Sequence, residues 1–256
     1  MKIYLLTFSL LFFAMVAFAQ ANKRPVKTKG LIYTREKAAN LSFNSSGFSF
    51  GYSKGKLKSY KTTPFWQFEL GRLKHAKEYK QISEITGVRS TKPYSFGKEN
   101  VFLVARLMRG QKKYLTEKAK TKGVAIGWQY MWGVSLGLLK PYYLKLQRQI
   151  DPGLPQEFSI KTEKYSLDNR DVFLDSRAIV GAAPFWKGIG ETKVLPGIHT
   201  RIGVLFDWGA FDETSKSVDA GVMIDIYPKA VPIMIDAKNY PFFLNLYINF
   251  QLGKRS

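Results

Sequence analysis

Alternation with a period of two runs through four segments of the chain, at 124–136, 198–208, 218–227 and 242–252. In each segment large apolar residues occupy every second position, and small or polar residues occupy the positions between. Successive side chains of a β-strand point to opposite faces, whereas a helix repeats every 3.6 residues. These segments are therefore predicted to be strands with one apolar face.

Weaker alternation predicts four more strands in the first half of the chain. Residues 39–44 and 48–53 flank a Ser-Ser-Gly turn and are typical of a hairpin. Residues 66–71 alternate in the same way, and residues 100–109 are apolar on both faces. The fold class predicted from these segments is all-β, with about eight antiparallel strands and eight to ten as the allowed range.

The face opposite the apolar stripe indicates what surrounds this sheet. The outward positions of a soluble barrel would be rich in Lys and Glu. Here lysine gathers between the strands, and the opposite faces carry Gly, Asn, Gln and Ser with a few charges. This pattern favours a closed transmembrane β-barrel with aliphatic residues toward lipid, while a soluble β-sandwich remains the alternative. The residues predicted to face lipid are Val124, Ile126, Trp128, Tyr130, Trp132, Val134, Leu136, Leu244, Leu246, Ile248 and Phe250.

The first residues have the pattern of a secretory signal peptide. One Lys precedes an apolar run that ends in Ala17-Phe18-Ala19, a typical cleavage site. The predicted organisation is a signal peptide at 1–19, a basic segment at 20–37 and an outer-membrane barrel at 38–256. Export by a cleaved signal peptide to the bacterial outer membrane is the predicted localisation.

Predicted connections alternate in length along the chain. If both mature ends lie in the periplasm, long loops should face outward and short turns inward. The outer connections are predicted at 45–47, 72–99, 139–197 and 228–241, and the inner ones at 55–63, 110–122 and 209–216. Residues 139–197 are too many for a structureless loop, so we expect more strand at 141–146. Part of this loop, 178–190, could fold over or into the barrel mouth.

Composition removes several classes of chemistry. The 256 residues contain no Cys and two His, which excludes disulfide scaffolds, thiolate sites and multi-histidine zinc sites, so no cofactor or metal is predicted. Forty Lys and Arg against 19 Asp and Glu give a net charge of +21. The predicted partners are outer-membrane lipid, including lipid A phosphates, and acidic proteins of an envelope complex. Nucleic acid is not a predicted partner, because the chain is exported and has no recognition module.

Three stretches carry a resemblance to a known family. They are LKHAKE at 73–78, SLGLLKPYY at 135–143 and NLYINFQLGKR at 245–255. With them the chain resembles a family of small outer-membrane β-barrel proteins from Bacteroidota. The resemblance implies the fold and the location, and it implies no catalytic residue because the family has no assigned function.

A few charged residues fall on the non-aliphatic face of the predicted strands. Eight strands leave room only for side chains, so ionised groups inside the barrel must pair with one another. We predict a lumen charge network that closes the barrel, and an ion path remains the alternative. Its predicted members are Arg201, Asp207, Asp219, Asp225, Glu69 and Arg106.

Catalytic residues are sparse. A lipid-modifying hydrolase at the barrel mouth would need a serine, a histidine and a carboxylate at one rim. The available combinations are His199 with Asp207 or Asp219, and His75 with Glu78. No nucleophile elbow or HExxH motif is present. The sequence therefore predicts a non-catalytic structural or accessory component of an envelope assembly, such as secretion or barrel-assembly machinery, with the hydrolase as the alternative.

Overall fold

The computed structural model describes residues 33–59, 61–83, 92–116, 123–149, 158–210 and 212–256. The predicted signal peptide at 1–19 and most of the basic segment at 20–37 lie outside the described residues.

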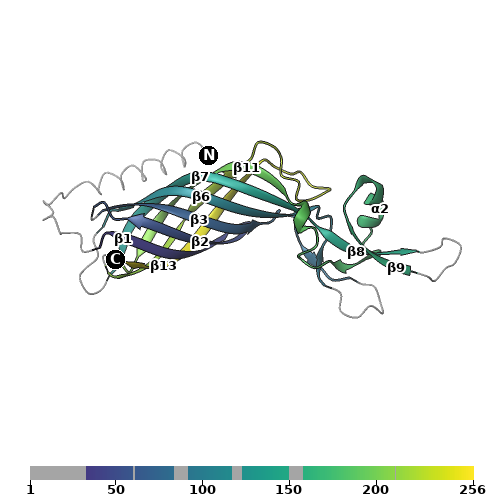
Figure 1. Ribbon diagram of the computed structural model, residues 1–256, viewed down its shortest axis with the longest axis horizontal. Coiled ribbons are helices and arrows are strands. Elements are labelled where there is room, and N and C mark those ends of the chain that lie inside the picture. The colour runs from purple at the N-terminus through teal and green to yellow at the C-terminus, as the bar shows by residue number, and fades with distance from the viewer. Residues whose placement is uncertain (1–32, 60, 84–91, 117–122, 150–157, 211) are drawn as a thin grey trace, which may run out of the picture. The chain divides into compact units, whose positions relative to one another are not determined.

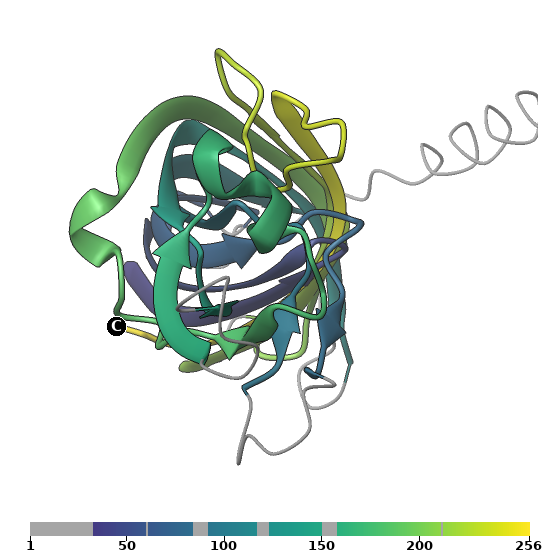
Figure 2. The same cartoon turned by 90° about the vertical axis from the view of Figure 1, so that its right-hand side faces the viewer.

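Eight antiparallel strands close into a barrel (Figure 1). Their order around the barrel is β1-β13-β12-β11-β7-β6-β3-β2. Seen from the direction of Figure 2, the strands form a ring. The strands are β1 (Arg35–Asn44), β2 (Gly47–Lys56), β3 (Thr62–Leu73), β6 (Asn100–Tyr114), β7 (Ala125–Pro141), β11 (Lys193–Asp207), β12 (Thr214–Ile226) and β13 (Phe242–Arg255). All eight predicted strands are confirmed, and the closed antiparallel barrel is the fold of the chain.

The first and last barrel strands close the ring. β1 pairs with β13 from Glu36 opposite Arg255 to Asn44 opposite Tyr247. β1 begins at Arg35, so residues 35–37 of the predicted basic segment belong to the barrel. The barrel therefore starts three residues earlier than the predicted boundary at residue 38.

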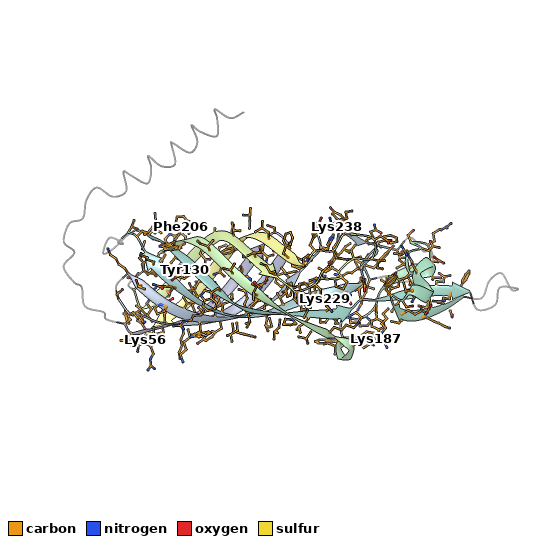
Figure 3. All side chains as sticks on the ribbon, turned by 90° about the horizontal axis from the view of Figure 1, so that it is seen from above. Lys56, Tyr130, Lys187, Phe206, Lys229 and Lys238 are labelled. Carbon is orange, nitrogen blue, oxygen red and sulfur yellow. The ribbon has the colours of Figure 1, made fainter. Side chains whose placement is uncertain are left out.

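The barrel has two ends with different connections. The residues 57–61, 115–124 and 208–213 join strands at one end, which we call the turn end. The two-residue turn 45–46 and the connections 74–99, 142–192 and 227–241 lie at the other, which we call the loop end. In Figure 3, Lys56 lies at the turn end, whereas Lys229 and Lys238 lie toward the loop end.

Smaller elements fill the loop-end connections. They are β4 (Lys80–Gln81), β5 (Tyr94–Ser95), β8 (Tyr143–Gln149), β9 (Phe158–Lys164), β10 (Ile179–Ala182), the 3-10 helices η1 (Leu167–Asn169) and η2 (Ile189–Glu191), and the short helix α2 (Arg170–Phe173). β8 follows β7 directly and forms a three-stranded sheet in the order β10-β8-β9. The additional strand expected at 141–146 is thus confirmed as the end of β7 and the start of β8.

A small apolar core lies in this three-stranded sheet. Leu144, Leu146, Phe173 and Ile179 are fully buried there, together with Tyr94 of β5. Residues 179–182 pair with β8 as β10, so this part of the predicted mouth loop builds the sheet. No helix in the described part of the chain is long and apolar enough to cross a membrane.

Candidate functional site

The two faces of the barrel wall have opposite chemistry. From Phe242 to Leu252 of β13 the exposed residues are apolar, whereas the alternate positions Asn245, Asn249 and Gln251 are buried. The same alternation occurs on β11, where Arg201 and Asp207 are buried. The buried polar and charged residues therefore lie on the lumen face and apolar residues cover the outside, which is the reverse of a soluble barrel.

The residues predicted to face lipid lie on the outer wall. Nine of them are exposed: Ile126, Tyr130, Trp132, Val134, Leu136, Leu244, Leu246, Ile248 and Phe250. Val124 and Trp128 are partly exposed. In Figure 3 the side chains of Tyr130 and Phe206 mark this wall in the turn-end half of the barrel.

Basic side chains border the apolar outer wall at both ends. At the turn end, Lys37 lies directly opposite Lys54 on one side and Lys254 on the other. At the loop end, Arg72 and Lys140 occupy outward positions of β3 and β7. An apolar belt between two basic borders is the pattern that a bilayer with anionic head groups would require.

A five-residue ion-pair network crosses the lumen in its loop-end half. Arg106 donates from Nε and Nη2 to the two carboxylate oxygens of Asp225, both at 2.8 Å, and from Nη1 to Glu69 Oε1 at 2.6 Å. Arg201 Nη2 lies 3.1 Å from both carboxylate oxygens of Glu69. His199 Nδ1 lies 2.9 Å from Asp225 Oδ1. Because β3 and β11 are not neighbours in the barrel, the Arg201–Glu69 pair ties together separate parts of the wall.

A second network lies in the turn-end half of the lumen. Lys112 Nζ donates to Glu36 Oε1 at 2.6 Å, and Arg255 Nε donates to Glu36 Oε2 at 2.7 Å. Arg255 Nη2 also reaches Asp207 Oδ2 at 3.1 Å, and the hydroxyl of Tyr114 donates to the same oxygen at 2.6 Å. These buried charges are compensated by opposite charges within hydrogen-bond distance, as ion pairs inside proteins must be.

The six predicted network residues are all buried, but they divide among different partners. Arg201 pairs with Glu69, and Asp207 pairs with Arg255. Asp219 accepts a hydrogen bond from Asn249 Nδ2 at 2.8 Å and forms no direct ion pair with a described residue. The guanidinium of Arg201 lies 4.5 Å from the ring centroid of Tyr247, which gives it a cation–π contact.

Glycine positions in the lumen make room for aromatic rings. A Cβ on Gly137 of β7 would lie 2.6 Å from the ring of Phe102 and 3.1 Å from that of Tyr227. The phenyl ring of Phe102 stacks on Phe243, with ring centroids 5.4 Å apart. Small residues on the lumen face therefore accommodate large ones from across a narrow interior.

The 227–241 connection covers the lumen at the loop end. Its residues Val231, Ile233 and Met234 are buried against Leu73 and Phe102 at the ends of β3 and β6. Asn239 fixes this segment, because its Nδ2 donates to the carbonyl of Met234 at 2.8 Å and its Oδ1 accepts from the amide of Ile233 at 3.1 Å. We call Val231, Ile233 and Met234 the apolar plug.

The predicted histidine combinations are not formed. His199 pairs with Asp225 rather than with Asp207 or Asp219. His75 accepts a hydrogen bond from the amide of Lys77, and its other ring nitrogen contacts the carbonyl of Lys238. His199 pairs with Asp225 because the strand register places Asp225 directly opposite it in the β11–β12 pairing.

The second histidine combination fails because its carboxylate has other partners. Glu78 Oε1 lies 2.9 Å from Arg72 Nη2 and 2.5 Å from Lys98 Nζ, so His75 has no carboxylate bonded to it in the described structure. Among the residues that the structure describes, no group of three or more His, Asp and Glu side chains is placed to hold a metal ion.

Sequence reasoning missed five members of the lumen networks: His199 was considered only as a catalytic candidate, Tyr114 was not singled out, and three charged residues lay outside the predicted strands. Lys112 was expected in a basic turn at 110–122, yet β6 continues to Tyr114 and carries Lys112 into the lumen. Glu36 and Arg255 lie beyond the predicted ends of β1 and β13. All three continue the lumen phase of their strands, so extending the period-two pattern past its apolar part would have identified them.

Comparison with known proteins gives structural neighbours but no family. No family model matches the chain, and no curated protein matches it at a significant level. Neisserial surface protein A aligns at 10% identity and TM-score 0.36, over 87% of this chain and 95% of that chain. Ail, the attachment invasion locus protein of Yersinia pestis, aligns at 8% identity and TM-score 0.37, over 87% and 97%. A major outer membrane protein from Thermus thermophilus aligns at 9% identity and TM-score 0.37, over 86% and 100%. At these identities, the barrel assignment rests on the strand pairing of this chain.

Proposed function

We propose that the chain is an integral outer-membrane β-barrel with a sealed lumen. On this proposal it is non-catalytic and serves as a structural or accessory component of an envelope assembly. The observation that carries the proposal is the pairing of Arg106, Glu69, Asp225 and Arg201 across the lumen.

Membrane insertion is supported by the outer wall. Val134 is 55% exposed and Leu246 is 67% exposed, although both lie within long strands where a soluble barrel would carry polar residues. Burial in lipid is the physical explanation for a continuous apolar belt on a closed barrel. The signal-peptide pattern at 1–19 and the small, polar lumen face support the same location.

A structural role is supported by the interior. A conducting barrel needs a hydrated path, whereas the described lumen holds two ion-pair networks and the apolar plug above them. Catalysis needs a nucleophile and base that substrate can reach, whereas the His199–Asp225 pair is buried beneath that plug.

A docking role is supported by the β10-β8-β9 sheet. Phe158 and Ile160 on β9 are exposed, as are Leu167 and Trp186 in the segments beside it. Exposed apolar and aromatic residues in a loop-end sheet are the type of surface that protein partners bury. The charge excess of the chain would favour an acidic partner.

Three measurements on the exported protein test this proposal. Heat-modifiable migration and resistance to alkaline extraction should show an inserted barrel. Planar-bilayer recording should show no discrete conductance steps. Affinity purification from detergent-solubilised membranes should recover a defined envelope complex whose yield falls when Phe158 and Ile160 are changed to Ser.

Other outcomes identify the alternatives. Stable conductance steps would indicate an ion-conducting barrel. A monomer that alters the mass of lipid A would indicate a lipid-modifying enzyme. A protein recovered in the soluble periplasmic fraction would contradict the membrane assignment.

A further inference from the structure

A basic pocket lies on the outer wall of the barrel at its loop end, separate from the lumen. Arg72 is on β3 with the same phase as the exposed Leu70, and Lys140 is on β7 with the same phase as the exposed Leu136. Between them, Val101 of β6 lies directly opposite Lys140. The pocket therefore opens on the side of the barrel that carries the apolar belt.

Loop residues complete the walls of this pocket. Its volume is about 160 Å³. The residues of its lining that bear on a ligand are Arg72, Lys80, Lys98 and Lys140, with the aromatic side chains Tyr142 and Phe185. Sites for drug-sized ligands have volumes of about 300–1,000 Å³, so this pocket fits a single phosphate or a part of a sugar.

Lys140 is the central cation of the pocket. Its side chain is buried, with 3% of the residue exposed, and its ammonium lies 5.1 Å from the ring centroid of Phe185. Its Nζ donates to the carbonyl oxygens of Pro141 at 3.2 Å and Lys187 at 3.0 Å. An ammonium has three donors, so one donor remains, and no carboxylate of the described residues forms an ion pair with it.

Two of the other cations of the pocket share one carboxylate. Arg72 and Lys98 both bind Glu78, and the Nε atom of Arg72 is buried without a hydrogen-bond partner in the described structure. Lys80 is exposed at the pocket and adds a further positive charge. Four cations against one carboxylate leave an excess of positive charge in a partly desolvated place, where it is costly without an anion.

We propose that this pocket binds a phosphate group of lipid A in the outer leaflet. This inference rests on the proposed function, because it requires the barrel to be inserted in an outer membrane. Three features support a lipid-borne phosphate: the pocket faces outward, it lies directly beyond the apolar belt, and it has aromatic walls against which a sugar ring can pack. Lys140 and Arg72 supply the charge-assisted hydrogen bonds to the phosphate oxygens.

Lipid binding to the purified full-length barrel tests the pocket. The protein is reconstituted in detergent micelles, and native mass spectrometry measures the binding of lipid A and of phosphatase-treated lipid A. We expect binding of lipid A and at least tenfold weaker binding after phosphate removal. Lys140→Gln and Arg72→Gln should each weaken binding by about tenfold or more, since each removes a charge-assisted hydrogen bond.

One control variant tests for general charge, and one milder pocket variant tests the pocket without disturbing a buried contact. Lys229→Gln removes an exposed lysine from another loop-end connection and should leave lipid A binding unchanged. Lys80→Gln removes an exposed pocket lysine without changing a buried contact, and should weaken binding by about two- to fivefold. Heat-modifiable migration confirms that each variant remains a folded barrel.

The outcomes separate the pocket from the membrane proposal. Equal binding of treated and untreated lipid A, or unchanged binding by folded Lys140→Gln and Lys80→Gln, would overturn the pocket while leaving the barrel in place. Displacement of lipid A by equimolar inorganic phosphate would show that the site takes a soluble anion instead. Failure of the wild-type protein to insert would overturn the proposed function itself.

Discussion

Buried charge occurs in two regions of this molecule and is balanced in only one. In the lumen, Glu69 and Asp225 surround Arg106 with carboxylate oxygens, and Arg201 completes the set. In the outer pocket, Glu78 bonds to two cations, and the hydrogen bonds of Lys140 within the described residues go to backbone carbonyls. A balanced set serves stability, whereas an unbalanced set leaves an electrostatic requirement that a ligand can meet.

The lumen should therefore respond most strongly to loss of a charge. Arg106→Ala removes the guanidinium that bonds to both Glu69 and Asp225, and should lower the free energy of unfolding by about 3–5 kcal/mol. Urea unfolding of the barrel in lipid vesicles measures the change. Arg109→Ala is the matched control, because Arg109 is exposed on the same strand and its contact with Trp66 is worth about 1 kcal/mol or less. Equal losses for both variants would mean that the lumen pairs have no special role.

The apolar belt should be nearly as sensitive when a charge is added. Val134→Arg places a guanidinium on the belt and should destabilise the inserted barrel by about 2–4 kcal/mol near the midplane. Thr214→Arg puts the same group at the turn-end border of the belt, where about 0–1 kcal/mol is expected. The amount of heat-modifiable barrel recovered from membranes measures how well each variant inserts. Normal insertion of Val134→Arg would contradict the assignment of this face to lipid.

The pairing within the lumen can be resolved by a double-mutant cycle. Arg201→Met and Glu69→Gln should couple by about 0.5–3 kcal/mol, because each removes the partner of the other. Arg201→Met with Asp207→Asn should be additive, because Asp207 pairs with Arg255. Additivity in both cycles would indicate charges that are separated by water, and a hydrated lumen would replace the sealed one.

In the outer pocket, the buried charge of Lys98 should lower the stability of the folded chain, and the effect should depend on pH. Burial lowers the pKa of Lys98 to about 8, from its usual 10.5, even though Glu78 favours the charged form. Between about pH 8 and pH 10.5 the unfolded chain binds this proton more strongly than the folded chain, so stability from Lys98 rises with pH in that window. Comparing wild type with Lys98→Met across this range isolates the contribution. If the free energy of unfolding of wild type, relative to that of Lys98→Met, falls as pH rises, the surroundings stabilise the ammonium and this prediction is wrong.

Period-two patterning predicted the strands because every barrel strand lies between two different environments. Val134 and Ser135 fall on opposite faces as their sequence positions require. The pairing of Arg201 with Glu69 was beyond such reasoning, because it depends on which strands face each other across the lumen. Asp225 lies on the strand adjacent to that of Arg201, and it binds Arg106 and His199.

The apolar plug and much of the outer pocket come from segments whose sequence has no periodic pattern. Ile233 and Met234 enter the mouth through a connection whose sequence has no strand or helix pattern. The outer pocket combines three strand ends with residues near 93–98 and 182–185, and only the folded chain brings them together. Alternation therefore predicts the strands of the barrel, but it does not predict how the loop-end connections pack at the end of the barrel.

The seam between β1 and β13 sets the order in which this barrel can form. Glu36 and Arg255 are 219 residues apart and bond across that seam. Contacts of such separation carry a large loop-closure cost and form slowly. Until β13 pairs on both sides, β1 and β12 each present an unsatisfied edge that another chain could bind. Synthesis of β1 to β12 therefore yields an intermediate that needs protection from aggregation, and the docking of one strand ends that exposure at two edges at once.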